Sequence, residues 1–305
     1  MSRAGRRAVG AGAGLLADMA LGDRPLRPHP VAAFGALMQE VEGRLYRDSR
    51  GAGVLHAAVG AAAGAGAGAA LQRALGRKAA GPVATYVAVA HRQLATAARD
   101  VAARLGADDL EGARAGLPAL VGRDPDGLDE KEISRAVVES VAENTVDAVV
   151  APVLWAVAGG APGVWAYRAV NTMDAMVGHR SPRHLRYGWA AARLDDGANW
   201  VPARLTAALV AACRPRRARE VWRAVRHDAP AHPSPNAGVA EAAFAAALGV
   251  RLGGTNRYGH RVEVRPSLGD GRAPDRSDIV PAVRLARDVS RALTGTVVLL
   301  GLLAP

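Results

Sequence analysis

Two long stretches of the chain lack charged side chains, and this pattern decides the class of protein that the sequence predicts. Residues 51–72 and 148–167 contain no Asp, Glu, Lys or Arg. The length of each stretch is close to what a helix needs to cross a bilayer, which is about 20 residues. The alternation of Gly and Ala in residues 51–72 is also typical of flexible low-complexity segments, but its length without charge favours a membrane helix.

Helix-breaking residues interrupt the second apolar stretch. Gly159, Gly160, Pro162 and Gly163 fall within five positions of one another, and an uninterrupted helix would hardly tolerate them. We therefore expect a broken helical hairpin, made of two half-length helices, near residues 148–174.

These patterns predict an all-α fold, a polytopic membrane helical bundle with additional amphipathic or interfacial helices. The shorter apolar segments 200–213 and 289–305 complete the predicted membrane segments, and a single membrane-embedded domain is expected over 1–305. The polar regions 105–147 and 175–200 carry the candidate motifs, while 253–277 is expected to be a polar loop.

The amino-acid composition narrows the range of functions that the protein can have. Half of the residues are hydrophobic but only 4% are aromatic, a mixture that suits closely packed helices in lipid. The net charge of +11 comes almost wholly from arginines scattered along the chain, without the spacing or aromatic platform of a nucleic-acid-binding module. Anionic lipid or a small phosphorylated substrate explains the charge better. Cys213 is the only cysteine, which excludes an intramolecular disulfide and a thiolate zinc site.

A stripe of polar residues follows one side of the helix expected from about residue 130. Arg135, Glu139, Glu143 and Asp147 recur every four residues, with Asn144 beside them. Carboxylates one turn apart can share a divalent cation or hold an ammonium group. An ordinary solvated face with favourable Arg–Glu pairing explains the same spacing.

Two further clusters lie close to apolar segments, where charge is costly unless it has a partner or a task. Asn171 and Asp174 follow the second apolar stretch directly. Asp195, Asp196 and Asn199 could present oxygen ligands to Mg²⁺ that also holds a phosphate. Aspartates that cap a helix are the alternative for this second cluster.

Ser234 and Asn236 open an Ala-rich helix in the string HPSPNAG. Either residue can cap that helix, and the free backbone N–H groups would favour a phosphate or a carboxylate. The sequence contains no GxxxxGK[ST] loop, no GxGxxG fingerprint and no GxSxG elbow, so a nucleotide would need another arrangement and a serine hydrolase is disfavoured.

Several long strings, in this order, resemble the CobD/CbiB family, the adenosylcobinamide-phosphate synthases of cobalamin biosynthesis. They are GRDPDGLDE, ISRAVVESVAENTVDAVVAP, YRAVNTMDAMVGHRSPRHLRYGWAAARLDDGANWVPARLTA, HPSPNAG and LGVRLGG. The similarity runs from about Asp18 to Asp270. This sequence departs from the usual family pattern at Pro125, Ala175 and Val239. None of these departures removes a charged residue of the motifs.

The resemblance implies a multi-pass cell-membrane ligase that joins adenosylcobyric acid to (R)-1-aminopropan-2-ol or its O-phosphate through an amide, with ATP and Mg²⁺. ATP would activate the corrin propionate as an acyl phosphate, which the amine attacks. Glu139, Glu143 and Asp174 are the implied catalytic residues, and Asp195, Asp196 and Asn199 the implied metal ligands. The remaining residues implied to bind substrate or phosphate are Arg123, Asp124, Arg135, Asn144, Asn171, Arg204, Ser234 and Asn236.

The resemblance also implies a location and partners. The active site is expected on the cytoplasmic side. Besides the corrinoid and aminopropanol substrates, the expected partners of the protein are membrane lipid and other late cobalamin-pathway membrane enzymes, and no nucleic acid is expected. Two alternatives stay open on the residues alone. A membrane prenyltransferase also uses Asp-rich motifs with Mg²⁺, and a non-catalytic membrane sensor such as the distantly related AmpE would leave the carboxylates without a task.

Overall fold

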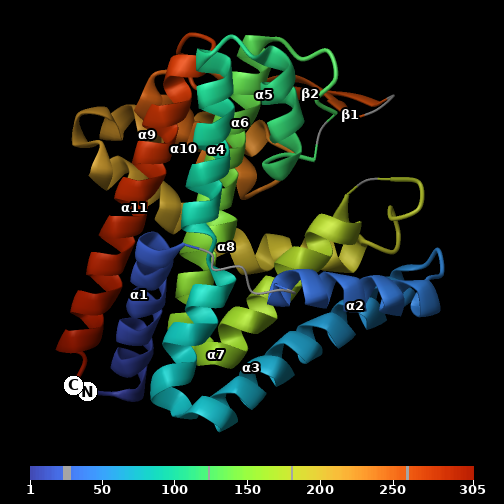
Figure 1. Ribbon diagram of the computed structural model, residues 1–305, viewed down its shortest axis with the longest axis vertical. Coiled ribbons are helices and arrows are strands. Elements are labelled where there is room, and N and C mark those ends of the chain that lie inside the picture. Colours follow the sequence, from blue (N-terminus) through green and yellow to red (C-terminus); the bar gives the residue numbers. More distant parts are fainter. Residues whose placement is uncertain (23–28, 123, 180, 259–260) are drawn as a thin grey trace. The chain divides into compact units, whose positions relative to one another are not determined.

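The computed structural model describes residues 1–22, 29–122, 124–179, 181–258 and 261–305, and it is almost entirely helical (Figure 1). The chain, expected to form a single domain, divides into two compact units. Unit 1 comprises Met1–Ala90, Asp147–Asn199 and Thr294–Pro305, and unit 2 comprises His91–Val146 and Trp200–Leu293. Both units draw on chain segments far apart in the sequence, which a linear scan of composition does not reveal.

The elements of unit 1 are α1 (Arg3–Leu21), α2 (Pro30–Leu45), α3 (Arg50–Ala88), α7 (Ala151–Met173) and the π-helical turn Asp174–Gly178. Those of unit 2 are α4 (His91–Gly106), α5 (Leu110–Gly116), α6 (Glu130–Thr145), α9 (Ala218–His227), α10 (Ala237–Leu248), β1 (Leu252–Tyr258) and β2 (Arg261–Leu268). Helices α8 (Trp189–Cys213) and α11 (Arg276–Leu303) contribute to both units.

Glycines spaced four residues apart let α3 pack closely on α7 in unit 1. Gly60, Gly64 and Gly68 are buried along one side of α3. A Cβ at Gly64 would lie 2.6 Å from the carbonyl oxygen of Trp165, and at Gly60 it would clash with Met173. The Gly-Ala alternation is therefore not a flexible segment: it forms a small-residue face of the kind that brings membrane helices together.

We expect Gly64→Ala to destabilise the protein by about 1–3 kcal/mol, because the added methyl group has no room against the α7 backbone. Gly66→Ala is the matched control on the exposed side of the same helix, where a Cβ meets nothing within 4 Å. The control should be neutral or stabilising by up to about 1 kcal/mol, since Ala favours a helix over Gly. Thermal unfolding of both variants in detergent measures the difference; equal effects would contradict the close contact.

Helix α7 is broken at Gly160, where the backbone adopts φ 65° and ψ −152° immediately before Ala161-Pro162. Residues 151–159 and 161–173 form two arms that fold back on each other. The Trp155 ring stacks on Tyr167 with centroids 6.4 Å apart, and a Cβ at Gly163 would lie 2.6 Å from the Trp155 carbonyl oxygen. The hairpin expected from the Gly-Pro cluster is present, because only Gly accepts the positive φ at its turn.

Apolar side chains remain exposed over unit 1. Leu16 and Leu21 of α1, and Val54 and Leu55 of α3, are each about half exposed. Within the described residues, the helical stretches Arg50–Gly106 and Glu130–Gly178 each contain a segment long and apolar enough to cross a membrane. Lipid is the solvent in which exposed side chains of this kind carry no penalty.

Helix α3 bends at Gly76, where φ is 72°, and its ribbon reverses direction there (Figure 1). Residues 50–75 before the bend span roughly 39 Å at the helical rise per residue, more than the about 30 Å of a hydrocarbon core. We therefore expect Arg47→Cys and Ala79→Cys, placed singly in a Cys213→Ala background, to react with an impermeant thiol reagent from opposite sides of the membrane. Labelling of both from one side would show that α3 does not cross.

Helix α10 is the central helix of unit 2. Its residues Ala237 to Ala247 are all buried. Their small side chains allow α6 and α9 to pack closely around the helix. The left-handed Gly249 (φ 72°, ψ 32°) ends the helix, as glycines commonly do after a last turn.

The segment 253–277, expected to be a polar loop, instead contains an antiparallel β-hairpin. Strands β1 and β2 pair from Leu252 with Leu268 to Tyr258 with Arg261, and the register shifts between Leu252 and Gly254. Gly253 and Gly254 have φ 84° and 99°, which only glycine adopts readily. The polar composition concealed the alternating pattern of Val262 and Val264 with charged neighbours, a pattern typical of strands.

Candidate active site

A carboxylate–amide cluster in unit 1 joins helices α7 and α8 and the π-helical turn before α7. The Asn171 side-chain nitrogen donates to Asp147 Oδ2 and to Asp195 Oδ1, each at 3.2 Å. Asp147 lies in the π-helical turn Val146–Val150 before α7, Asn171 lies near the end of α7, and Asp195 lies in α8. The α7 hairpin is what brings Asp147 and Asn171 together, although 24 positions separate them in the sequence.

The arrangement continues through Asn199 and Tyr167. Asn199 donates to Asp195 Oδ2 at 3.0 Å, one helical turn away, and its own amide oxygen accepts from the Tyr167 hydroxyl at 2.9 Å. The same hydroxyl lies 3.1 Å from the Asp147 carbonyl oxygen. Asn199 is buried, so its amide fixes the Asp195 carboxylate from inside the unit.

Arg168 sets the orientation of the Asn171 amide. Its guanidinium donates to Asn171 Oδ1 at 3.1 Å, which leaves the Asn171 nitrogen facing the two carboxylates. The Arg168 Nε is buried without a hydrogen-bond partner in the described part of the chain. One cation is therefore held beside two carboxylates through a bridging amide.

Asp195 and Asp196 have different surroundings, although they are adjacent in sequence. Burial raises the pKa of Asp195; the hydrogen bonds from Asn171 and Asn199 oppose that shift, and the neighbouring Asp196 adds to it. Burial also raises the pKa of Asp196, against the attraction of Arg193, whose guanidinium lies 3.6 Å from the Asp196 carboxylate. The structure thus brings Asp195 and Asn199 together with Asp147 and Asn171, while Asp196 forms an ion pair along the surface of α8.

The oxygen atoms of Asp147 and Asp195 are the groups in this cluster best suited to a hard divalent cation. Mg²⁺ in proteins commonly takes one or two carboxylates and completes its shell with water and substrate phosphates. No group of three or more His, Cys, Asp or Glu side chains within the described residues is arranged to hold a metal ion. The donor set therefore fits a two-carboxylate site better than an all-protein cage.

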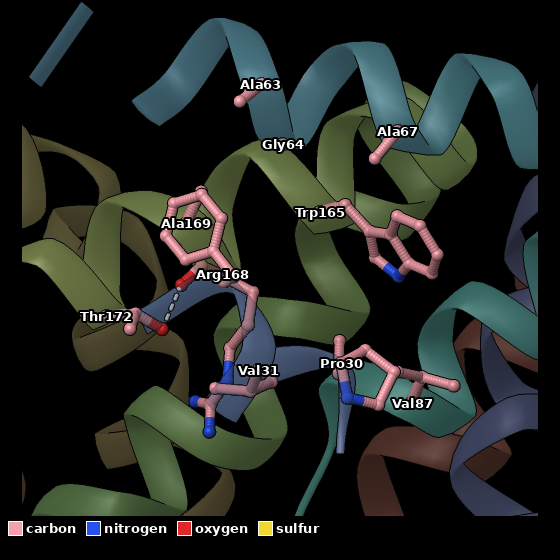
Figure 2. A pocket seen from close by; sticks show the side chains of 12 residues that line it. Pro30, Val31, Ala63, Gly64, Ala67, Val87, Trp165, Arg168, Ala169 and Thr172 are labelled. Atoms are coloured by element: carbon pink, nitrogen blue, oxygen red, sulfur yellow. Dashed lines mark hydrogen bonds between the residues drawn. The ribbon is translucent and has the colours of Figure 1, made fainter. Parts of the chain in front are cut away.

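An apolar pocket of about 160 Å³ opens beside the cluster, between α2, α3 and α7. Figure 2 shows Trp165 on one side of the pocket and the Arg168 side chain extending toward Val31 of α2. The Thr172 hydroxyl donates to the Arg168 carbonyl oxygen at 2.7 Å (Figure 2). Arg168 thus belongs both to the pocket wall and to the carboxylate–amide cluster.

In unit 2, Arg135 and Glu139 hold the start of β1. The Arg135 guanidinium donates to the carbonyl oxygens of Gly253 and Thr255, and the Gly253 N–H donates to Glu139 Oε1 at 2.9 Å. Glu139 is only 3% exposed. Both residues therefore contact the β-hairpin; their predicted catalytic and phosphate-binding roles stay predictions.

The predicted polar stripe is regular only within α6, which holds Arg135, Glu139 and Glu143. Glu143 is exposed, and Asn144 donates back to the Ser140 carbonyl oxygen at 2.9 Å. The π-helical turn that follows α6 changes the helical repeat at Asp147, so the four-residue spacing does not continue the stripe to that residue. Asp147 instead belongs to the cluster of unit 1.

The HPSPNAG string forms a second polar arrangement in unit 2. Ser234 Oγ accepts from the backbone N–H groups of Asn236 and Ala237 at 3.3 and 3.2 Å, so it stabilises the start of α10. The Asn236 amide oxygen accepts from Arg204 at 3.0 Å, and the Arg204 guanidinium lies 4.5 Å from the Trp200 ring centre. Arg204 and Asn236, both predicted to bind substrate, are therefore in contact.

The remaining predicted residues are placed as follows. Asp124 accepts from the Asp126 N–H at 3.0 Å within a turn, and Asp174 begins the π-helical turn after α7, where its carboxylate lies against Gly178. Arg123 lies outside the described residues.

Sequence reasoning missed several residues of these clusters. Tyr167 and Arg168 directly precede the Asn171 motif, and the spacing of three residues between Arg168 and Asn171 is the signal that could have identified the pair. In unit 2, the carboxylate of Glu241 is fully buried in α10, 3.8 Å from His232 and 3.9 Å from Arg265. A lone acid in an apolar helix marks a residue with a specific partner.

Comparison with known proteins places these motifs in a family. The model of the family described as CobD/Cbib protein matches residues 11–286. Cobalamin biosynthesis protein CobD of Mycobacterium tuberculosis is 51% identical over 289 residues, which cover 93% of this chain and 92% of that protein. Proteins of the same name from Geobacter metallireducens and Rhodobacter capsulatus are 44% and 41% identical, over 85% and 90% of this chain and 86% and 89% of their own lengths. No solved structure matches the chain.

Proposed function

The chain belongs to the CobD/CbiB family, and on that basis we propose that it forms an amide bond in cobalamin biosynthesis. The reaction joins a carboxyl group of adenosylcobyric acid to the amine of (R)-1-aminopropan-2-ol or of its O-phosphate. ATP supplies the free energy by transferring a phosphoryl group to the carboxyl oxygen, which releases ADP. The amine then attacks this acyl phosphate, so that the amide C–N bond forms and inorganic phosphate leaves. The observation that carries the proposal is the carboxylate–amide cluster of unit 1, which lies within the matched residues.

Asp147 and Asp195 are the residues that would hold Mg²⁺, which when bound would neutralise the charge of the nucleotide phosphates. Asn171 lies between the two carboxylates and keeps both directed at one position. Asn199 and the Tyr167 hydroxyl hold this arrangement from behind. Such supporting hydrogen bonds commonly change metal affinity or activity by about 10–100-fold.

The other groups act on the organic substrates. Arg168 would attract an anionic group of the amine substrate or the nucleotide, because its guanidinium lies in the wall of the neighbouring pocket. Glu143 is exposed in unit 2 and is the candidate base for the ammonium group, with Asp174 as a further candidate in unit 1. Arg204 and Asn236 form the candidate contact for a substrate carboxylate or phosphate.

The proposed location is the cell membrane, with several crossings and an active site open to the cytoplasm. The exposed apolar side chains of unit 1 and the length of α3 support membrane insertion. The family match favours the amide ligase over a membrane prenyltransferase.

The test supplies membranes containing the protein with adenosylcobyric acid, MgATP and either aminopropanol or its phosphate, and separates the corrin products by mass. We expect an amide product with one of the two amines and none without ATP. Parallel reactions with labelled isoprenyl diphosphate test the prenyltransferase. A folded preparation that forms no amide with either amine would exclude the proposed reaction.

A further inference from the structure

A second pocket of unit 1 gathers positive charge at the end of the unit where α3 bends. Its lining includes five cationic side chains from two segments about 70 positions apart, and no Asp or Glu. These cationic residues are Arg3, Arg6, Arg7, Arg77 and Lys78. The turn of the α7 hairpin, at Gly160 and Ala161, completes the wall.

Within the described residues, no acidic side chain lines this pocket beside the five cations. None of them forms an ion pair with another part of the described chain. Arg7 donates to the Ala158 carbonyl oxygen at 2.6 Å and Arg6 to the Met1 carbonyl oxygen at 2.5 Å, so two guanidinium groups are held in place by neutral partners. Like charges gathered in this way repel one another unless an anion joins them.

Three helix N-termini add to the positive potential. Helix α1 begins at Arg3, the second part of α3 begins after Gly76, and the second arm of α7 begins after Gly160. Each helix start presents free backbone N–H groups and about half a positive charge. Convergent helix starts with arginine side chains are the arrangement by which proteins bind phosphate groups.

The size of the pocket selects a small anionic group. Its volume is about 60 Å³. Because a water-sized group needs roughly 10–15 Å³, this volume holds about four to six such groups. This is about the size of a single phosphate group.

Exposed leucines beside the pocket indicate where the phosphate comes from. Leu75 precedes the bend of α3 and is 47% exposed, while Leu300 and Leu303 near the end of α11 are 60% and 71% exposed. The end of α11 packs against the start of α1, since a Cβ at Gly301 would lie 2.8 Å from the Gly5 carbonyl oxygen; Figure 1 shows the two chain termini side by side. Cations bordered by exposed apolar side chains match the headgroup level of a membrane.

We propose that this pocket binds the phosphate of an anionic phospholipid, with the lipid chains lying along the neighbouring leucines. The site is distinct from the carboxylate–amide cluster, which lies at the opposite end of the α7 hairpin from Gly160. Its occupant would fix the depth of unit 1 in the bilayer by holding α1, the bend of α3 and the α7 turn at the headgroup level.

The test measures lipid retained by the purified full-length protein, by native mass spectrometry during titration with phosphatidylglycerol or phosphatidylcholine. We expect phosphatidylglycerol to bind at least ten times more tightly. In Arg77→Gln/Lys78→Gln its affinity should fall about 30-fold, which corresponds to about 2 kcal/mol at 1.4 kcal/mol per tenfold. The control Arg47→Gln/Arg186→Gln removes the same charge from exposed positions at the other end of α3 and should bind like the parent.

Three results would overturn the proposal. Equal affinity for the two lipids, or equal loss in the two double variants, would mean that the pocket does not select an anionic headgroup. Full displacement of phosphatidylglycerol by millimolar inorganic phosphate would assign the pocket to a free phosphate instead. Circular dichroism and thermal unfolding of each variant establish that any loss of binding occurs in a folded protein, and none of these measurements depends on the ligase reaction.

Discussion

Replacing Asp195 with Asn is expected to lower kcat by about 100-fold or more, the scale of losing one electrostatic contact to the transition state. The Asp195 carboxylate accepts from Asn171 and Asn199, and with Asp147 it forms the oxygen set proposed for Mg²⁺. The Mg²⁺ concentration that gives half-maximal rate should therefore increase. Initial rates over a range of Mg²⁺ concentrations measure both effects, and higher Mg²⁺ should recover part of the rate.

Asp196→Asn is the matched control for this prediction. It removes the same charge one position away, but the Asp196 carboxylate pairs with the largely exposed Arg193, and exposed pairs contribute only about 0–1 kcal/mol. We expect its rate and its Mg²⁺ dependence to stay within a few-fold of the parent. If Asp196→Asn were as impaired as Asp195→Asn, the adjacent pair predicted from the sequence would be the metal site, and the Asp147–Asp195 assignment would be wrong.

Arg168→Gln is expected to lower kcat by about 10–100-fold, the range found when a residue that orients a ligand is changed. Without the guanidinium, nothing fixes the Asn171 oxygen away from the carboxylates, so the amide can turn. The change also removes a positive charge near the proposed cation site. The Mg²⁺ concentration for half-maximal rate should consequently stay the same or decrease, opposite to its change in Asp195→Asn.

Arg168→Lys separates charge from geometry in the same assay. Lysine keeps the charge but lacks the planar, forked donor set of arginine, so we expect a partial recovery of kcat and a Mg²⁺ dependence like that of the parent. A loss of kcat accompanied by a higher Mg²⁺ requirement in both Arg168 variants would instead indicate general damage to the cluster. Unfolding temperatures of the two variants provide the check on folding.

Local patterns in the sequence were enough to predict the helical class and the broken hairpin. Gly160 and Pro162 disfavour a continuous helix wherever they are placed, so the break of α7 follows from the residue types themselves. The β-hairpin has a weaker local signal, the short alternation of Val262 and Val264 with charged residues, which the polar composition of the segment conceals. The hydrogen bond of the Gly253 N–H with Glu139, 114 positions away, is a long-range contact that no local propensity reports.

The same distinction between local and long-range contacts applies to the candidate site. The pattern of residue types identifies the candidates, because acids and amides beside apolar segments need partners. It also links Asp195 to Asn199 through the helical repeat. The same repeat allows the pair of Asp196 with Arg193, three positions apart in α8. The contacts of Asp147 and Asn171, of Asn171 with Asp195, and of Glu139 with Gly253 come from tertiary packing. The reason is that the helical period fixes neighbours within one helix, whereas the turn at Gly160 and the packing of α8 on α7 fix neighbours between helices.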